Sequence, residues 1–162
     1  MSSSNGPNTV TSGLVLELDA GNIKSYQSGS TTWYDKSGYG NNGTLTNGPT
    51  FSSANLGSLV FNGTNNYVSC GSGSLLNITN SITLEAWMNP NAFVGGAGVN
   101  AIAGKWANNA RSYKIAILTA SKVFYIDVSN SGTDDNYRSS TTVLSTNTWY
   151  HAVGTFTSGS LN

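Results

Sequence analysis

The stretch Ile82–Met88, which reads ITLEAWM, decides the fold class. Its first, third, fifth and seventh residues are apolar, and Thr83, Glu85 and Trp87 lie between them. A period of two residues places these sets on opposite faces of a β-strand. The apolar set is the predicted core face, so the stretch is typical of an antiparallel sheet that is covered on one side.

Short runs of the same kind recur along the chain, whereas no window shows the apolar spacing of an amphipathic helix. Seven of them predict further strands, at Leu14–Leu18, Ser58–Phe61, Tyr67–Cys70, Ser112–Leu118, Lys122–Val128, Arg138–Val143 and Trp149–Phe156. Turn-forming clusters of Gly and Asn separate them. Strands without intervening helices predict an all-β fold with antiparallel pairing, in a sandwich or a barrel.

The strands at 112–118 and 122–128 each carry a second, mixed face. Lys114 and Ala116 oppose the apolar set of the first strand, and Val123, Tyr125 and Asp127 oppose that of the second. Such a face suits solvent, a bed for loops or a binding surface, and the sequence leaves these three open.

The composition limits the partners. Gly, Asn, Ser and Thr make up half of the 162 residues, while seven basic and seven acidic residues cancel to a net charge of zero. Nucleic acids and anionic membranes attract dense basic patches, so we expect neither as a partner. The first 13 residues contain no apolar run, and no segment has the length of a transmembrane helix. We therefore expect no membrane insertion.

The chain has too few cysteines and histidines for a fold held by disulfide bonds or by zinc. Cys70 is the single cysteine and His151 the single histidine, which excludes an intramolecular disulfide framework and a Cys/His zinc site. We interpret both as packing residues. Residues 1–12, rich in Ser and Asn, are expected to form a flexible arm, and residues 13–162 one sandwich domain.

The order of several segments resembles the laminin-G-like branch of the concanavalin A-like lectin/glucanase superfamily. The segments are Gly13–Asn22, Trp33–Leu45, Leu59–Val68, Ile82–Pro90 and Thr148–Thr155. The resemblance implies a two-sheet antiparallel jelly-roll sandwich, the class that the strand pattern predicts independently.

Two departures from relatives carry expectations. Asn62 and Asn66 stand where relatives often have carboxylates, and a calcium site needs that negative charge, so we expect no metal and no cofactor. Relatives also continue through several strands beyond the segment that ends here near residue 157. The sandwich is therefore expected to lack its last strands, and its open edge to be covered by other protein subunits in a larger assembly or by a longer chain.

Candidate sites remain few. Glu17 and Asp19 resemble the paired carboxylates of glycosidases in the superfamily, but we expect Asp19 to accept turn hydrogen bonds and predict no catalytic residue. Trp33, Trp87 and Trp149 are interpreted as packing residues. The candidate ligand-binding residues lie in a polar loop with an indole and in a second, weaker cluster; they are Trp106, Asn108, Asn109 and Arg111, then Tyr137 and Arg138.

These features predict a non-enzymatic binding or structural module. The composition, the lack of an export signal and the lack of disulfides suit a bacteriophage virion protein, such as a fibre, decoration or adhesion component, which binds other subunits and, as a second partner, a cell-surface glycan. The alternative is a carbohydrate-binding domain of a bacterial surface or secreted protein, at an extracellular or cell-surface location. A glycoside hydrolase is the third alternative.

Overall fold

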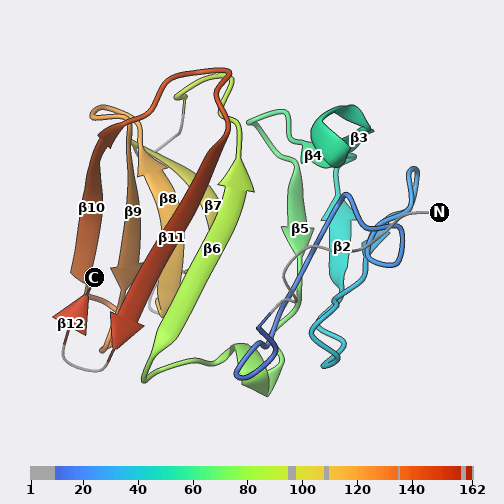
Figure 1. Ribbon diagram of the computed structural model, residues 1–162. Helices are drawn as coiled ribbons and strands as arrows, with labels where there is room; N and C mark the ends of the chain where they lie inside the picture. Colours follow the sequence, from blue (N-terminus) through green and yellow to red (C-terminus); the bar gives the residue numbers. More distant parts are fainter. Residues whose placement is uncertain (1–9, 95–97, 108–109, 135, 158–159, 162) are drawn as a thin grey trace. The chain divides into compact units, whose positions relative to one another are not determined.

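The computed structural model describes residues 10–94, 98–107, 110–134, 136–157 and 160–161 (Figure 1). The chain divides into two compact units, Met1–Leu75 and Leu76–Asn162. Nearly all regular structure is antiparallel β-sheet, with two short 3₁₀ turns, η1 at Ala54–Leu56 and η2 at Ser74–Leu76. Among the described residues, no helix has the length and apolar character needed to cross a membrane.

The first unit is built from short strands. One sheet has the order β1-β2-β5, and a two-stranded sheet pairs β3 with β4. The strands are β1 (Thr32–Trp33), β2 (Gly43–Thr46), β3 (Thr50–Ser52), β4 (Ser58–Val60) and β5 (Tyr67–Ser69). The Tyr26 ring contacts one aromatic residue of each sheet: its centroid lies 6.3 Å from that of Trp33 on β1 and 5.6 Å from that of Phe51 on β3.

The second unit has two sheets, of order β10-β9-β8-β7 and β12-β11-β6 (Figure 1). Their strands are β6 (Ile82–Met88), β7 (Val99–Lys105), β8 (Tyr113–Leu118), β9 (Val123–Val128), β10 (Asn136–Val143), β11 (Tyr150–Thr157) and β12 (Ser160–Leu161). β-Branched and aromatic residues dominate β8 and β9, and most residues of these two strands are buried.

The core of the second unit lies between these two sheets. Ile82 and Phe156 from the three-stranded sheet cluster with Ile115, Ile117 and Ile126 from the four-stranded sheet. Gly154 on β11 permits a close approach, because a Cβ there would lie 2.7 Å from the Cβ of Ile126. The predicted all-β class and sandwich are therefore confirmed, and so is the core face of β6, since Leu84, Ala86 and Met88 also pack on the cluster.

The prediction of a strand at Leu14–Leu18 is wrong, because no strand is assigned there. The backbone of this segment forms hydrogen bonds with the loop that contains Asp35. The Glu17 N–H donates to Asp35 Oδ1 at 3.0 Å, and the Glu17 carbonyl accepts from the Lys36 N–H at 2.8 Å. The alternating LVLEL pattern indicated the extended backbone but not its partners. The strand β7 was missed, since VNAIAGK alternates poorly, and its ladder is interrupted by a register shift between Ala101 and Ala103.

Candidate ligand-binding site

A row of side chains crosses the outer face of the four-stranded sheet. Lys114 on β8 is the register partner of Asp127 on β9, and Asp127 is the register partner of Tyr137 on β10. Cross-strand partners share one face of a sheet, and here that face is opposite the core cluster. The register therefore brings together an ammonium, a carboxylate and a phenol.

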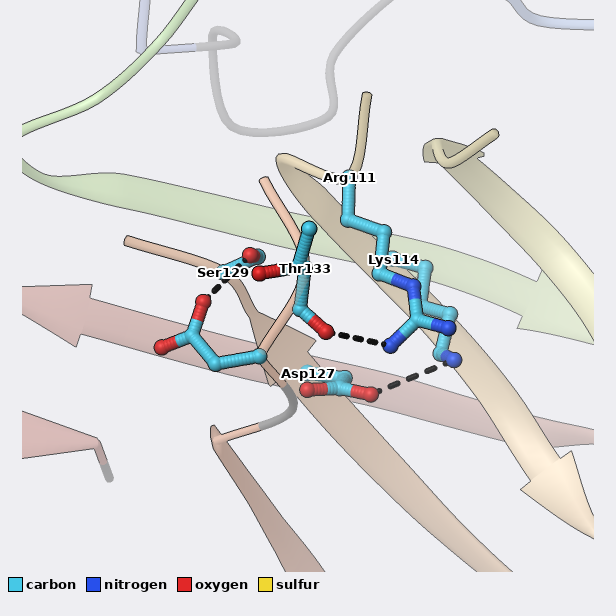
Figure 2. A network of polar contacts seen from close by, with 6 residues as sticks. Arg111, Lys114, Asp127, Ser129 and Thr133 are labelled. Atoms are coloured by element: carbon cyan, nitrogen blue, oxygen red, sulfur yellow. Dashed lines mark hydrogen bonds and ion pairs between the residues drawn. The ribbon is translucent and has the colours of Figure 1, made fainter. Parts of the chain in front are cut away.

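The two charged side chains of this row form an ion pair that is little exposed to solvent. Lys114 Nζ lies 3.2 Å from Asp127 Oδ2, and the side chains are 17 % and 3 % exposed (Figure 2). Desolvating two charges is costly unless other groups support them. The Lys114 ammonium lies 3.9 Å from the centroid of the Trp106 ring and 5.6 Å from that of Tyr125, in positions suited to cation–π attraction. A buried carboxylate and two aromatic rings thus surround one half-buried cation.

A hollow of about 220 Å³ lies over this row. It is lined by Lys114, Leu118, Tyr125, Asp127 and Tyr137. The Tyr125 and Tyr137 rings meet edge to face, with centroids 5.9 Å apart, and Tyr137 is 52 % exposed. The volume is below the ~300–1,000 Å³ of sites for drug-sized ligands. It suits one small ring of a ligand that extends beyond it.

Arg111 ties the loop of Trp106 to a neighbouring turn. Its Nη1 donates to the Thr133 carbonyl at 2.8 Å (Figure 2). Its guanidinium carbon lies 5.6 Å from the Trp106 centroid. In the same turn, Asp134 Oδ1 accepts from Ser129 Oγ at 2.6 Å and from Ser131 Oγ at 2.7 Å. Hydrogen bonds from Ser129 and then from Ser131 hold the pKa of Asp134 well below its usual range. The carboxylate organises the turn that Arg111 contacts.

The structure groups some of the predicted residues and separates others. Trp106 and Arg111 lie around Lys114, and Tyr137 lines the hollow above Asp127. Arg138 follows Tyr137 on β10, where strand alternation places it on the opposite face, and its Nη1 donates to the Tyr137 carbonyl at 3.0 Å. Asn108 and Asn109 lie outside the described residues. A ligand role for all six stays a prediction.

The sequence prediction left out Lys114, Tyr125 and Asp127. The available signal was the mixed second face of the two central strands, which indicated a binding surface as one of three alternatives. The structure gives that face a hollow and an ion pair whose carboxylate is buried, rather than a plain solvent boundary.

The three tryptophans interpreted as packing residues differ in burial. Trp33 and Trp149 are half-buried. Trp87 is 68 % exposed, so its interpretation as a packing residue is wrong. It lies on the outward face of β6, as the alternation predicted, and its ring stacks on that of His151 with centroids 4.8 Å apart.

The surroundings of Cys70 and Asp19 favour structural roles for both residues. Burial raises the pKa of the Cys70 thiol, and the charge of Asp35 raises it further, which disfavours the thiolate. Asp19 Oδ1 accepts from the Gly21 N–H at 2.9 Å, so the predicted turn hydrogen bond is confirmed.

The loop of Asn62 and Asn66, where relatives often have carboxylates, is closed by its own hydrogen bonds. Asn62 Oδ1 accepts from the backbone N–H groups of Thr64, Asn65 and Asn66 at 2.9, 3.1 and 3.2 Å. An oxygen surrounded by donors is poorly placed to bind a cation. Within the described part of the chain, no group of three or more His, Cys, Asp or Glu is positioned to hold a metal.

These features define an antiparallel β-sandwich with a mixed aromatic and charged outer face. Residues 62–162 match a family model described as the concanavalin A-like lectin/glucanases superfamily, of the laminin-G type. Since the match covers more than half of the chain, the chain belongs to this superfamily, and the resemblance seen in the sequence is confirmed. No curated protein and no solved structure matches the chain significantly.

Proposed function

We propose that the chain is a non-enzymatic carbohydrate-binding module and that its site is the outer face of the four-stranded sheet. The observation that carries the proposal is the Lys114–Asp127 pair, which lies beneath a hollow walled by tyrosines and beside an indole. Sugars combine apolar C–H faces with hydroxyl groups. Aromatic side chains stack on the former, and charged groups bond the latter strongly.

The arrangement offers both kinds of contact at one place. Tyr137, half-exposed at the mouth of the hollow, supplies ring surface and a phenolic hydroxyl. Lys114 and Asp127 at its floor supply a donor and an acceptor whose mutual contact fixes their positions. A laminin-G-type sandwich is compatible with such binding and is generally non-catalytic. Glu17 and Asp19 do not lie on a strand, so they lack the strand arrangement on which their resemblance to glycosidase carboxylates rested.

A glycan array probed with the parent protein, Tyr137→Ala and Trp106→Ala tests the proposal. Both variants should lose retention of at least one glycan that the parent binds. Trp106→Ala also removes the cation–π contact to Lys114, worth about 1 kcal/mol, so Tyr137→Ala is the cleaner variant. Tyr39→Ala, which truncates another exposed tyrosine, is the matched control and should bind normally. A parent protein that retains no glycan contradicts the proposal.

The second candidate is a structural subunit of a bacteriophage virion that binds other protein subunits. Leu56 and Ile23 in the first unit are 93 % and 75 % exposed, and a protein subunit that binds there would cover them. Placement on a virion or at a cell surface stays a prediction. Sedimentation at micromolar concentration tests self-assembly, and a purely monomeric parent protein would contradict association between copies.

A further inference from the structure

The outer face of the other sheet, β12-β11-β6, carries an exposed tryptophan. Trp87 on β6 is 68 % exposed. A single exposed apolar residue is ordinary on protein surfaces, so exposure alone indicates little. The arrangement of the neighbouring side chains gives this tryptophan a defined geometry.

His151 on β11 is the register partner of Trp87. The two rings are nearly parallel, at 11°, with centroids 4.8 Å apart. The imidazole therefore covers one face of the indole, and the large exposed area belongs to the opposite face and the ring edge. Stacking restricts the indole and leaves a flat apolar surface open to solvent.

Glu85 adds a hydrogen-bonding group on the same face. Its Oε2 lies 3.6 Å from His151 Nε2, and the Glu85 and His151 side chains are 66 % and 40 % exposed. Residues two apart on a strand are about 7 Å apart, so a ligand that covers the indole reaches this carboxylate. The flat apolar face of the indole thus lies beside the Glu85 carboxylate and the His151 imidazole, which orient each other.

We propose that Trp87, His151 and Glu85 form a second binding site, for a neutral carbohydrate chain. The C–H face of one sugar ring stacks on the open face of Trp87, and its hydroxyls bond to Glu85, while His151 orients both of these side chains. The carboxylate disfavours acidic glycans. This inference rests on a different sheet face and different residues from the proposed function, and it implies that one domain binds glycan on both outer faces.

A protein partner fits this surface less well. Trp87 and Val153 are the large exposed apolar residues on this face among the residues that the structure describes. The other outward residues of β6 and β11 are polar: Thr83, Glu85, His151, Thr155 and Thr157. A specific protein interface generally buries at least about 1,000 Å², with apolar anchors in closely packed pockets. A flat plate flanked by polar groups is better matched to a sugar.

The test follows the indole N–H signals of the four tryptophans in ¹H–¹⁵N spectra of the full chain, assigned with single Trp→Phe variants. The probes are neutral hexasaccharides of glucose, xylose, mannose and N-acetylglucosamine at millimolar concentration, with oligogalacturonate as the acidic control. We expect at least one neutral probe to shift the Trp87 signal saturably and oligogalacturonate to leave it unchanged. Trp87→Ala should weaken binding of that probe at this face by about tenfold or more, equivalent to 1.4 kcal/mol. Val153→Ala is the matched control on the same face and should bind normally.

The same spectra separate this inference from the proposed function. Shifts confined to the Trp106 signal support the proposed site and overturn the second one. Shifts confined to the Trp87 signal support the second site alone. A panel that moves neither signal overturns both proposals. A Trp87 signal that shifts on dilution without any glycan indicates contact between copies of the chain, and that result overturns the carbohydrate assignment of this face.

Discussion

Lys114 and Asp127 are direct cross-strand partners, and their charged atoms lie 3.2 Å apart on a face of the sheet opposite the core. On β7 the position next to Lys114 is Gly104, where a Cβ would lie 2.7 Å from the Cβ of Lys114. The lysine is therefore enclosed by a glycine on one side and by its counter-ion on the other. This pairing links the stability of the sheet to the candidate ligand site.

Asp127→Ala should destabilise the protein by about 3 kcal/mol, because it leaves the Lys114 ammonium in a mostly desolvated place without its carboxylate. Urea denaturation at neutral pH measures the change. The double variant Lys114→Met/Asp127→Leu should recover most of the loss, since it removes both charges at similar volume. If the single and double variants were equally unstable, the loss would come from packing rather than from the charge.

Gly104→Ala should cost about 1–3 kcal/mol, as overpacked sites do. The added methyl would lie 2.7 Å from the Tyr113 carbonyl oxygen and 2.8 Å from Lys114 Cα, both backbone atoms that can move only with the strand. Ala103→Ser on the same strand is the control, since Ala103 is exposed and a surface change of this kind is worth within ~0.5 kcal/mol. Equal midpoints in urea for the two variants would show that β7 adjusts freely.

The sequence was informative wherever one strand could be read by itself. In ITLEAWM the alternation predicts which residues of β6 enter the core, because burial of one face is a property of a single strand. Val99–Lys105 was not predicted as a strand, since VNAIAGK alternates poorly and Gly104 reflects the close approach of Lys114 on β8. Leu14–Leu18 looked like a strand, but its hydrogen-bond partners lie in a loop that the pattern does not reveal.

The candidate site shows the same limit. Trp106 was identifiable because an indole in a polar loop is unusual. Its contact with Lys114 depends on how the loop folds back over the sheet, and the pairing of Lys114 with Asp127 depends on the register of two strands. Register is set by turn geometry and by burial of the other face, so a local reading of either strand could not supply it.

Calcium or a chelator should leave the melting temperature of the protein unchanged. The amide oxygen of Asn62 already accepts three backbone N–H groups, and Asn66 Oδ1 accepts from the Asn62 N–H at 2.8 Å. A ligand at a hundred times its dissociation constant stabilises the native state by about 2.7 kcal/mol. Differential scanning calorimetry detects such an effect, and a calcium-dependent rise of several degrees would contradict this prediction.

Asp35→Asn should destabilise the protein at neutral pH by about 2 kcal/mol, in proportion to the hydrogen bonds it weakens. The Asp35 carboxylate accepts from the N–H groups of Glu17, Ser37 and Asn41 at 3.0, 2.9 and 2.9 Å, and from Ser37 Oγ at 2.7 Å. An amide can accept through one oxygen only, and its NH₂ group would face a donor. With its oxygen in the Oδ1 position the amide keeps the bonds from Glu17 and Ser37, and the Asn41 N–H loses its acceptor, which hydrogen exchange of the Asn41 amide measures directly.

The pH dependence of the same variant provides an independent check. Burial by itself would raise the pKa of Asp35, but hydrogen bonds from Glu17, Ser37 and Asn41 outweigh it and hold the pKa below its usual value. A carboxylate whose pKa is lower in the folded state contributes stability that is complete above its unfolded pKa of about 3.9, and that contribution falls as the pH drops below this value. The stability difference between the parent protein and Asp35→Asn should thus be constant near neutral pH and narrow below about pH 4. Asp19→Asn is the control, since the amide oxygen can still accept the one hydrogen bond from Gly21. A gap that stays constant down to pH 2 would show that the ionised carboxylate of Asp35 does not hold this loop together.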